Sequence, residues 1–324
     1  MNTAGCDCPS RSIMRLIVCA CVLWMMVGSF FLPSAFGQGK GVPQKSFATP
    51  AEAARALAAA YRKGDRRAVA EILGDKAGRL VLSGDPVIDQ HERAWFLSLY
   101  GEGYEVVADG KNRAVLQLGN DGEPYPIPLI KKDARWRFDP SEGHEDLLSR
   151  RISKAELSAL NVVSAHLNAQ REYHKKDHKG SGTLEYAQRF RSTPGQEDGL
   201  YWGEASGKAE GPIAALAEAA IKEGYQPAKE GEWPVYRGYV YKILTAQGPQ
   251  ASGGERNYIV NGRMTGGFAL VAFPVRYGVS GIMTFMVNQD GAIYQKDLGP
   301  DTVAMGRQMT RFDPDASWTK GRAN

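Results

Sequence analysis

All four cysteines of this 324-residue chain, Cys6, Cys8, Cys19 and Cys21, lie near its N-terminus. The chain from Gln38 onward contains none, which excludes disulfides, thiolate metal sites and a cysteine nucleophile there. Such a chain must be stabilised by its hydrophobic core. With 43% hydrophobic and 23% charged residues it has a globular composition. Its length suffices for two ordinary domains.

The cysteines fall in a segment typical of a cleavable secretion signal. Two arginines precede an apolar run over residues 16–31, Pro33 breaks the run, and residues 35–37 supply small side chains before a cleavage point. We therefore predict a signal peptide over 1–37, a polar linker over 38–46, and export to the periplasm or the medium. Contact with the membrane would then be transient. The alternative is an uncleaved anchor, although the run is short against the roughly 20 residues of a typical span.

The net charge of +4 is small and spread along the chain. Basic residues occur in pairs such as Lys131-Lys132 and Lys175-Lys176, and they form no stripe that could follow a phosphate backbone. Nucleic acid is therefore not an expected partner.

Residues 47–150 are predicted to form an α+β domain. Thr49-Pro50-Ala51-Glu52 is a capping box that begins the first of three helices. The period then changes to short segments rich in β-branched and aromatic residues, separated by turn residues. These predicted strands are Tyr104–Ala108, Arg113–Leu118, Tyr125–Lys131 and Arg135–Asp139. Together they predict an antiparallel meander that follows the helices.

Residues 151–324 are predicted to form a second α+β domain. Ser153-Lys154-Ala155-Glu156 is another capping box, and the apolar spacing after it predicts one long helix to about His174. A shorter helix is predicted over Pro212–Glu223. The rest is rich in predicted strands: Val235–Leu244, Asn257–Val260, Gly267–Pro274, Gly281–Gln289 and Ala292–Lys296. The long helix is expected to pack on this small antiparallel sheet.

Two architectural resemblances follow from this order of elements. Helices followed by a meander that ends in Arg135-Trp136-Arg137-Phe138 resemble the cone of nuclear-transport-factor-2-like domains. The long helix before a small antiparallel sheet resembles the headgroup of type IV pilins and pseudopilins. In pilins the apolar N-terminal segment continues directly into that helix, whereas here a whole domain separates the two, which argues against assembly into a filament.

From about Phe47 to Trp318 the chain also resembles the bacterial domain of unknown function 2950 family. The matching motifs are Ser83–Pro86, Tyr186–Phe190, Ser192–Gly195, Asp198–Trp202, Leu244–Gly248, Val260–Phe268, Tyr277–Gly281 and Lys296–Pro300. The resemblance implies an exported envelope protein without an assigned chemistry.

No template for catalysis is complete. Gly278-Val279-Ser280-Gly281 is one residue short of a nucleophile elbow and is more simply a turn between strands. Asp297, Asp301, Asp313 and Asp315 stand beside proline or glycine, or in other turn sequences near the C-terminus. The glycines at 262, 266 and 267 lack dinucleotide-binding spacing, and close backbone approach explains them. We therefore name no catalytic and no cofactor-binding residues.

The metal motifs are also incomplete. His166, His174 and His178 form the best histidine cluster, but lysines surround the last two, which favours a solvated helix end. Asp177 to Gln188 overlays the opening of a calcium loop. Lys179 occupies a ligand position of that loop and Gln188 replaces the bidentate Glu, so a glycine-rich loop is the simpler explanation. No metal site is predicted.

Aromatic residues are the remaining candidates for a functional site in the second domain. Tyr239 and Tyr241, at i and i+2, share one face of a strand. Core packing is the simpler interpretation, and a binding surface for a glycan or peptide is the functional one. The candidate surface residues are Tyr201, Trp202, Tyr239, Tyr241, Tyr258 and Arg263. The favoured function is a non-enzymatic module that binds an envelope protein or polymer, and the alternative is a hydrolase or lyase acting on an envelope polymer.

Overall fold

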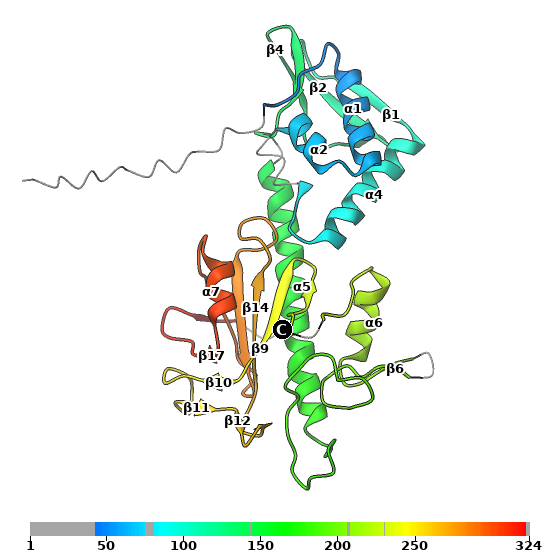
Figure 1. The fold of residues 1–324 in the computed structure, drawn as a ribbon. Coiled ribbons are helices and arrows are strands. Elements are labelled where there is room, and N and C mark those ends of the chain that lie inside the picture. Colours follow the sequence, from blue (N-terminus) through cyan, green and yellow to red (C-terminus); the bar gives the residue numbers. More distant parts are fainter. Residues whose placement is uncertain (1–42, 75–80, 143, 206–207, 230, 322–324) are drawn as a thin grey trace, which may run out of the picture. The chain divides into compact units, whose positions relative to one another are not determined.

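Helices and mostly antiparallel sheets alternate along the chain, which confirms the α+β class (Figure 1). The computed structural model describes residues 43–74, 81–142, 144–205, 208–229 and 231–321. The predicted signal peptide and the first part of the predicted linker lie outside the described residues. The described residues all belong to one compact unit.

The first helices start at side chains that cap them. The helices are α1 (Pro50–Lys63), α2 (Arg66–Leu73) and α4 (Pro86–Glu102). The Thr49 hydroxyl accepts a hydrogen bond from the Glu52 amide, which confirms half of the predicted capping box. The Asp65 carboxylate accepts from the Ala68 amide. Each contact satisfies an amide that the helix itself leaves unpaired.

These helices pack on one face of a five-stranded antiparallel sheet. Its strands are β1 (Tyr104–Ala108), β2 (Arg113–Leu118), β3 (Glu123–Pro124), β4 (Leu129–Lys132) and β5 (Arg135–Phe138). The order is β1-β2-β4-β5, with β3 paired to β2. The predicted bounds of β1 and β2 are confirmed. The third predicted strand begins later, at Leu129, because Pro126 and Pro128 have no amide hydrogen to donate to a ladder.

One long helix, α5 (His144–Tyr173), follows this sheet. Its predicted end is confirmed, but its predicted start at Ser153 is wrong. The helix begins at His144, nine residues earlier, because Leu147 and Leu148 pack against the first hydrophobic core and stabilise an additional stretch of helix. The predicted boundary between residues 150 and 151 therefore falls inside a continuous helix.

A six-stranded antiparallel sheet forms the centre of the C-terminal part, in the order β18-β16-β15-β14-β9-β8. Its strands are β8 (Val235–Tyr236), β9 (Tyr239–Leu244), β14 (Ala269–Pro274), β15 (Met283–Asn288), β16 (Ile293–Asp297) and β18 (Thr319–Lys320). The predicted hairpin at Asn288-Gln289-Asp290-Gly291 joins β15 to β16. The other elements are β6 (Gly203–Ala205), β7 (Lys208–Glu210), α6 (Ala214–Lys222), β10 (Ala246–Gln247), β11 (Arg256–Asn257), β12 (Ile259–Val260), β13 (Arg263–Met264), α7 (Thr302–Gln308) and β17 (Arg311–Phe312).

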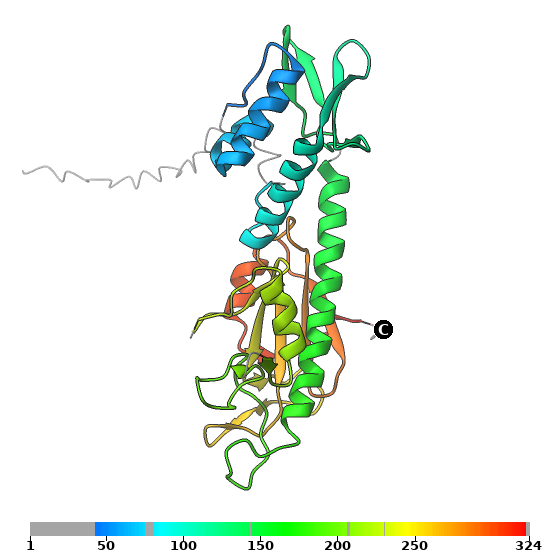
Figure 2. The ribbon, with the colours of Figure 1, turned by 90° about the vertical axis from the view of Figure 1, so that its right-hand side faces the viewer.

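Both faces of this sheet are covered. Helix α5 lies along one face (Figures 1 and 2), where its Ala159 and Val163 join a core with Tyr239 and Tyr241. Helix α7 contacts the other face at β14. Every residue of β14 is buried, as its continuous apolar run requires for a strand covered on both sides.

Gly306 shows how closely α7 approaches the sheet. A methyl group at this buried position would lie 2.5 Å from the Phe273 ring. We expect Gly306→Ala to lower the free energy of unfolding by about 2 kcal/mol, because overpacking exceeds the gain of about 1 kcal/mol in helix propensity. Gly101 of α4 is the matched control, since nothing lies within 4 Å of its added methyl group. Gly101→Ala should stabilise the protein, and equal thermal shifts for both variants would contradict the close contact.

The Ser83–Pro86 motif forms a buried polar cluster around Asp85. The Asp85 carboxylate accepts hydrogen bonds from Val87 N (3.0 Å), Ile88 N (3.4 Å), Tyr225 Oη (2.9 Å) and Gly238 N (2.8 Å). Tyr225 and Gly238 lie 140 and 153 residues further along the chain. Arg276 adds a hydrogen bond from Nη1 to the Leu82 carbonyl (2.8 Å). The cap of α4 is thus also a junction between distant segments.

Candidate functional site

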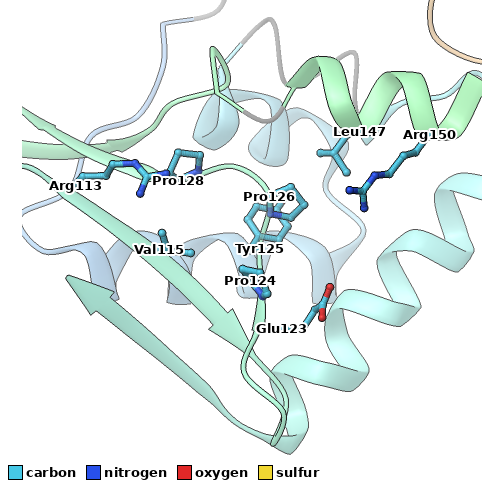
Figure 3. A pocket seen from close by; sticks show the side chains of 9 residues that line it. All are labelled: Arg113, Val115, Glu123, Pro124, Tyr125, Pro126, Pro128, Leu147 and Arg150. Carbon is cyan, nitrogen blue, oxygen red and sulfur yellow. The ribbon is translucent and has the colours of Figure 1, made fainter. Parts of the chain in front are cut away.

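A pocket of about 350 Å³ lies beside strand β2 (Figure 3). Arg113 and Val115 line it, and they alternate with Ala114 and Leu116, which face the core under the helices. The pocket therefore lies on the opposite face of β2. Strand β3, the segment that follows it and the first turns of α5 supply the other walls.

The walls are mainly apolar. Val115, Pro124, Tyr125, Pro126, Pro128 and Leu147 line the pocket. Three of these six are prolines at alternate positions, and a proline ring fixes the backbone φ angle at about −65°. Tyr125 is held to β2 by a hydrogen bond from its amide to the Leu116 carbonyl (2.7 Å). The prolines and this hydrogen bond thus restrict the backbone of this wall.

Charged groups stand at opposite ends of the pocket. Arg113 lies at one end and forms ion pairs with Asp109 and with Glu142 (3.0 Å). Figure 3 shows Arg150 and Glu123 on the side of the pocket away from Arg113. Both are exposed, and neither forms an ion pair with a described residue. The Arg150 guanidinium is therefore available to an anionic group at the edge of an apolar pocket.

A second pocket of about 250 Å³ adjoins the first, and Glu123 lines both. Trp95 and Leu99 of α4 form its apolar side, and the Trp95 side chain is 47% exposed. Its polar side carries Glu102 and Asp121. The two pockets thus share one acidic residue, and among their described lining residues Arg150 is a cation without an ion-pair partner.

The four tyrosines predicted to form an aromatic binding surface are buried, and they lie in different parts of the core. Tyr239 and Tyr241 share a sheet face, as predicted, but that face is buried under α5. Tyr258 belongs to the core on the other side of the sheet, and burial raises its pKa to about 12. Tyr201 is buried in a third cluster with Tyr173. These four tyrosines form core, the simpler of the two interpretations.

The two other candidates are only partly buried. Trp202 donates from its indole nitrogen to the Gly199 carbonyl (2.9 Å), and the Lys176 ammonium lies 5.9 Å from its ring centre. Arg263 lies on the β12–β13 hairpin. With the tyrosines buried, neither residue has the predicted aromatic neighbours around it on a surface.

The three histidines lie in different environments. His166 is fully buried between Phe190 and Phe268. His174 stacks on Tyr186 with ring centres 4.1 Å apart. The expected solvated helix end is wrong for His178, because its side chain is 3% exposed and contacts both the Glu197 carboxylate and the Tyr173 carbonyl. No group of three metal-ligating side chains occurs among the described residues.

The calcium-like loop is closed by its own hydrogen bonds. Asp177 accepts from the amides of Lys179 and Gly182, and these bonds, Gly182 first, lower the pKa of its carboxyl group. The Lys179 ammonium lies 2.7 Å from the buried Glu185 carboxylate. A cationic side chain thus already neutralises the one buried acid of the loop, which supports the simpler prediction.

The remaining motifs are structural. The Ser280 hydroxyl is buried and exchanges hydrogen bonds with the Arg276 backbone, which confirms a turn. Asp297 and Asp315 accept from amides two residues ahead, as turn residues do. An added methyl group at Gly266 would lie 2.4 Å from the Asn257 carbonyl oxygen, which confirms the predicted close backbone approach.

Sequence reasoning missed the pocket beside β2. The alternating prolines at 124, 126 and 128 were the available signal, since they interrupt a predicted strand. Arg150 and Leu147 could not be assigned to the site, because the helix that positions them was predicted to begin only at Ser153.

The fold defines an α+β protein in which one long helix follows a helix-covered meander and packs on a second antiparallel sheet. The chain belongs to the family described as protein of unknown function (DUF2950), whose model matches residues 44–320. No curated protein and no solved structure matches it. Among the described helices, none has the length and apolar character needed to cross a membrane.

Proposed function

We propose that this protein is exported to the bacterial envelope and binds there a ligand with an apolar body and one anionic group. The observation that carries the proposal is the position of Arg150. Its guanidinium has no ion-pair partner among the described residues and stands at the rim of the apolar pocket beside β2. A guanidinium pairs well with the planar oxygens of a carboxylate or phosphate.

The shape of the site supports binding. The volume of about 350 Å³ lies within the roughly 300–1,000 Å³ of small-molecule sites. The backbone of the Pro124–Pro128 segment is already restricted by its prolines, so it loses less conformational freedom when a ligand binds, which lowers the entropic cost of association. The export part of the proposal rests on the signal-like sequence over residues 1–37 and on the lack of cysteine after them.

The experiment is capture from the envelope fraction of the source bacterium with the C-terminally tagged chain, followed by mass spectrometry. We expect the recovered protein to begin at Gln38 and to retain an anionic component. Arg150→Glu should reduce that component at least about tenfold, since it replaces a charge-assisted contact by repulsion.

Lys229→Glu is the matched control, because it makes the same charge change at an exposed residue outside both pockets. It should retain the ligand as the unchanged protein does. Equal retention by all three proteins would place binding elsewhere, and recovery of nothing above background would contradict a binding role.

A further inference from the structure

Strand β1 is an edge strand with free backbone groups. Asp109 N bonds to the Arg113 carbonyl (2.9 Å) and Gly119 N bonds to the Gly103 carbonyl (2.9 Å). Residues 103, 105, 107 and 109 therefore face β2, since the ladder alternates. The N–H and C=O groups of Tyr104, Val106 and Ala108 point away from β2. No described residue forms a hydrogen bond with them.

The other sheet edges of the described chain are short or covered. At β5, Phe47 exchanges two hydrogen bonds of 2.8 Å with Trp136. The six-stranded sheet ends in β8 and β18, which have two residues each. By contrast β1 has five residues, Tyr-Glu-Val-Val-Ala, with neither proline nor lysine. Figure 1 shows it as the outermost strand of its sheet. Soluble proteins normally protect such an edge against pairing.

We propose that β1 pairs antiparallel with β1 of a second copy of this chain and joins the two sheets across a two-fold axis. The axis passes through Val106, so that Val106 faces the partner's Val106 and Tyr104 faces the partner's Ala108. All three outward-facing residues of each strand then form hydrogen-bonded pairs. An antiparallel pair of identical strands is self-complementary, as a two-fold interface requires.

The side chains favour this register. A shift of the axis to residue 105 would place Glu105 directly opposite the partner's Glu105, which is unfavourable. A shift to residue 107 would leave Tyr104 outside the strand pairing. In the proposed register Glu105 faces the partner's Val107. The Tyr104 ring, 38% exposed and stacked on Tyr100, lies across from the small Ala108 side chain.

Sedimentation equilibrium of the chain from Gln38 onward tests the proposal. We expect a reversible dimer, and we expect Ala108→Pro to raise its dissociation constant by on the order of tenfold or more, because two interchain hydrogen bonds are lost per dimer. The substitution removes an amide that β2 does not use. Ala108→Ser keeps the amide and should dimerise as the unchanged chain does. A monomer at all concentrations, or equal dimerisation of both variants, would overturn the proposal.

The absence of cysteine after residue 21 allows a direct test of the register. Glu105→Cys and Val107→Cys would place their sulfurs in a non-hydrogen-bonded pair across the axis, at a Cα separation of about 4.5 Å that a disulfide can span. Mixing the two variants under mild oxidation should give the crosslinked dimer, and each variant alone should give much less. Equal crosslinking in all three samples would exclude this register. Thermal melting of each variant confirms that it is folded.

Discussion

Asp85→Ala is expected to lower the free energy of unfolding by about 3 kcal/mol or more, the largest effect we predict for one substitution. The carboxylate is fully buried and accepts the Tyr225 hydroxyl and the Gly238 amide in addition to two amides of α4. Its removal leaves several buried donors without an acceptor, and each such donor costs about 1–3 kcal/mol. Denaturant unfolding followed by circular dichroism measures the change.

Two variants separate the junction from the helix cap. Asp65→Ala removes an exposed cap with one hydrogen bond to Ala68, and it should cost only about 1 kcal/mol. Asp85→Asn keeps one oxygen for α4 but turns an amide group toward the Gly238 N–H, so its cost should lie between the other two. If Asp85→Ala cost no more than Asp65→Ala, the junction would contribute nothing beyond capping.

Between pH 7 and pH 5 the protein is expected to lose about 2 kcal/mol of stability through His166 alone. Burial lowers the pKa of this imidazole from 6.5 to about 3, and neither ring nitrogen has a hydrogen-bond partner among the described residues. The native state therefore keeps the ring neutral. Below pH 6.5 the unfolded chain binds a proton that the native chain does not bind, so stability falls until the pH reaches about 3. Above pH 6.5 both states are neutral and the contribution is constant.

His166→Leu removes this proton-binding site and should flatten the stability profile between pH 7 and pH 5 by about the same 2 kcal/mol. At pH 7 the variant should be at least as stable as the unchanged protein, because an apolar side chain replaces an unpaired polar one. The exposed His91 provides the control, and His91→Gln should keep the original slope. Identical slopes for all three proteins, measured by denaturant unfolding at each pH, would contradict the neutral buried ring.

Local signals predicted much of the secondary structure. Strands β1 and β2 were predicted to the residue, because β-branched runs end at turn residues such as Asp109-Gly110. The start of α5 was not predicted. A capping box at Ser153 is a local pattern, whereas Leu147 and Leu148 extend the helix through contacts with a core built from distant residues.

The candidate site was less predictable. Alternation correctly placed Tyr239 and Tyr241 on one face of a strand, yet it could not indicate that α5 covers that face. The same limit applies to Arg150, whose place beside the Pro124–Pro128 segment depends on how α5 leaves the first sheet. Whether a side chain is exposed depends on the residues that pack around it, and for these side chains those residues are far away in the sequence.

By itself the sequence determines that the chain after residue 21 is free of cysteine, that helices precede a meander, and where most turns fall. These properties depend on residue identity and on neighbours within a few positions. Tertiary structure alone decides which tyrosines are buried and that Asp85 bonds to residues 140 and 153 positions further along the chain. It also decides that Arg150 stands at a pocket without an ion-pair partner among the described residues. Burial and pairing depend on contacts between distant parts of the chain, which form only when the chain folds.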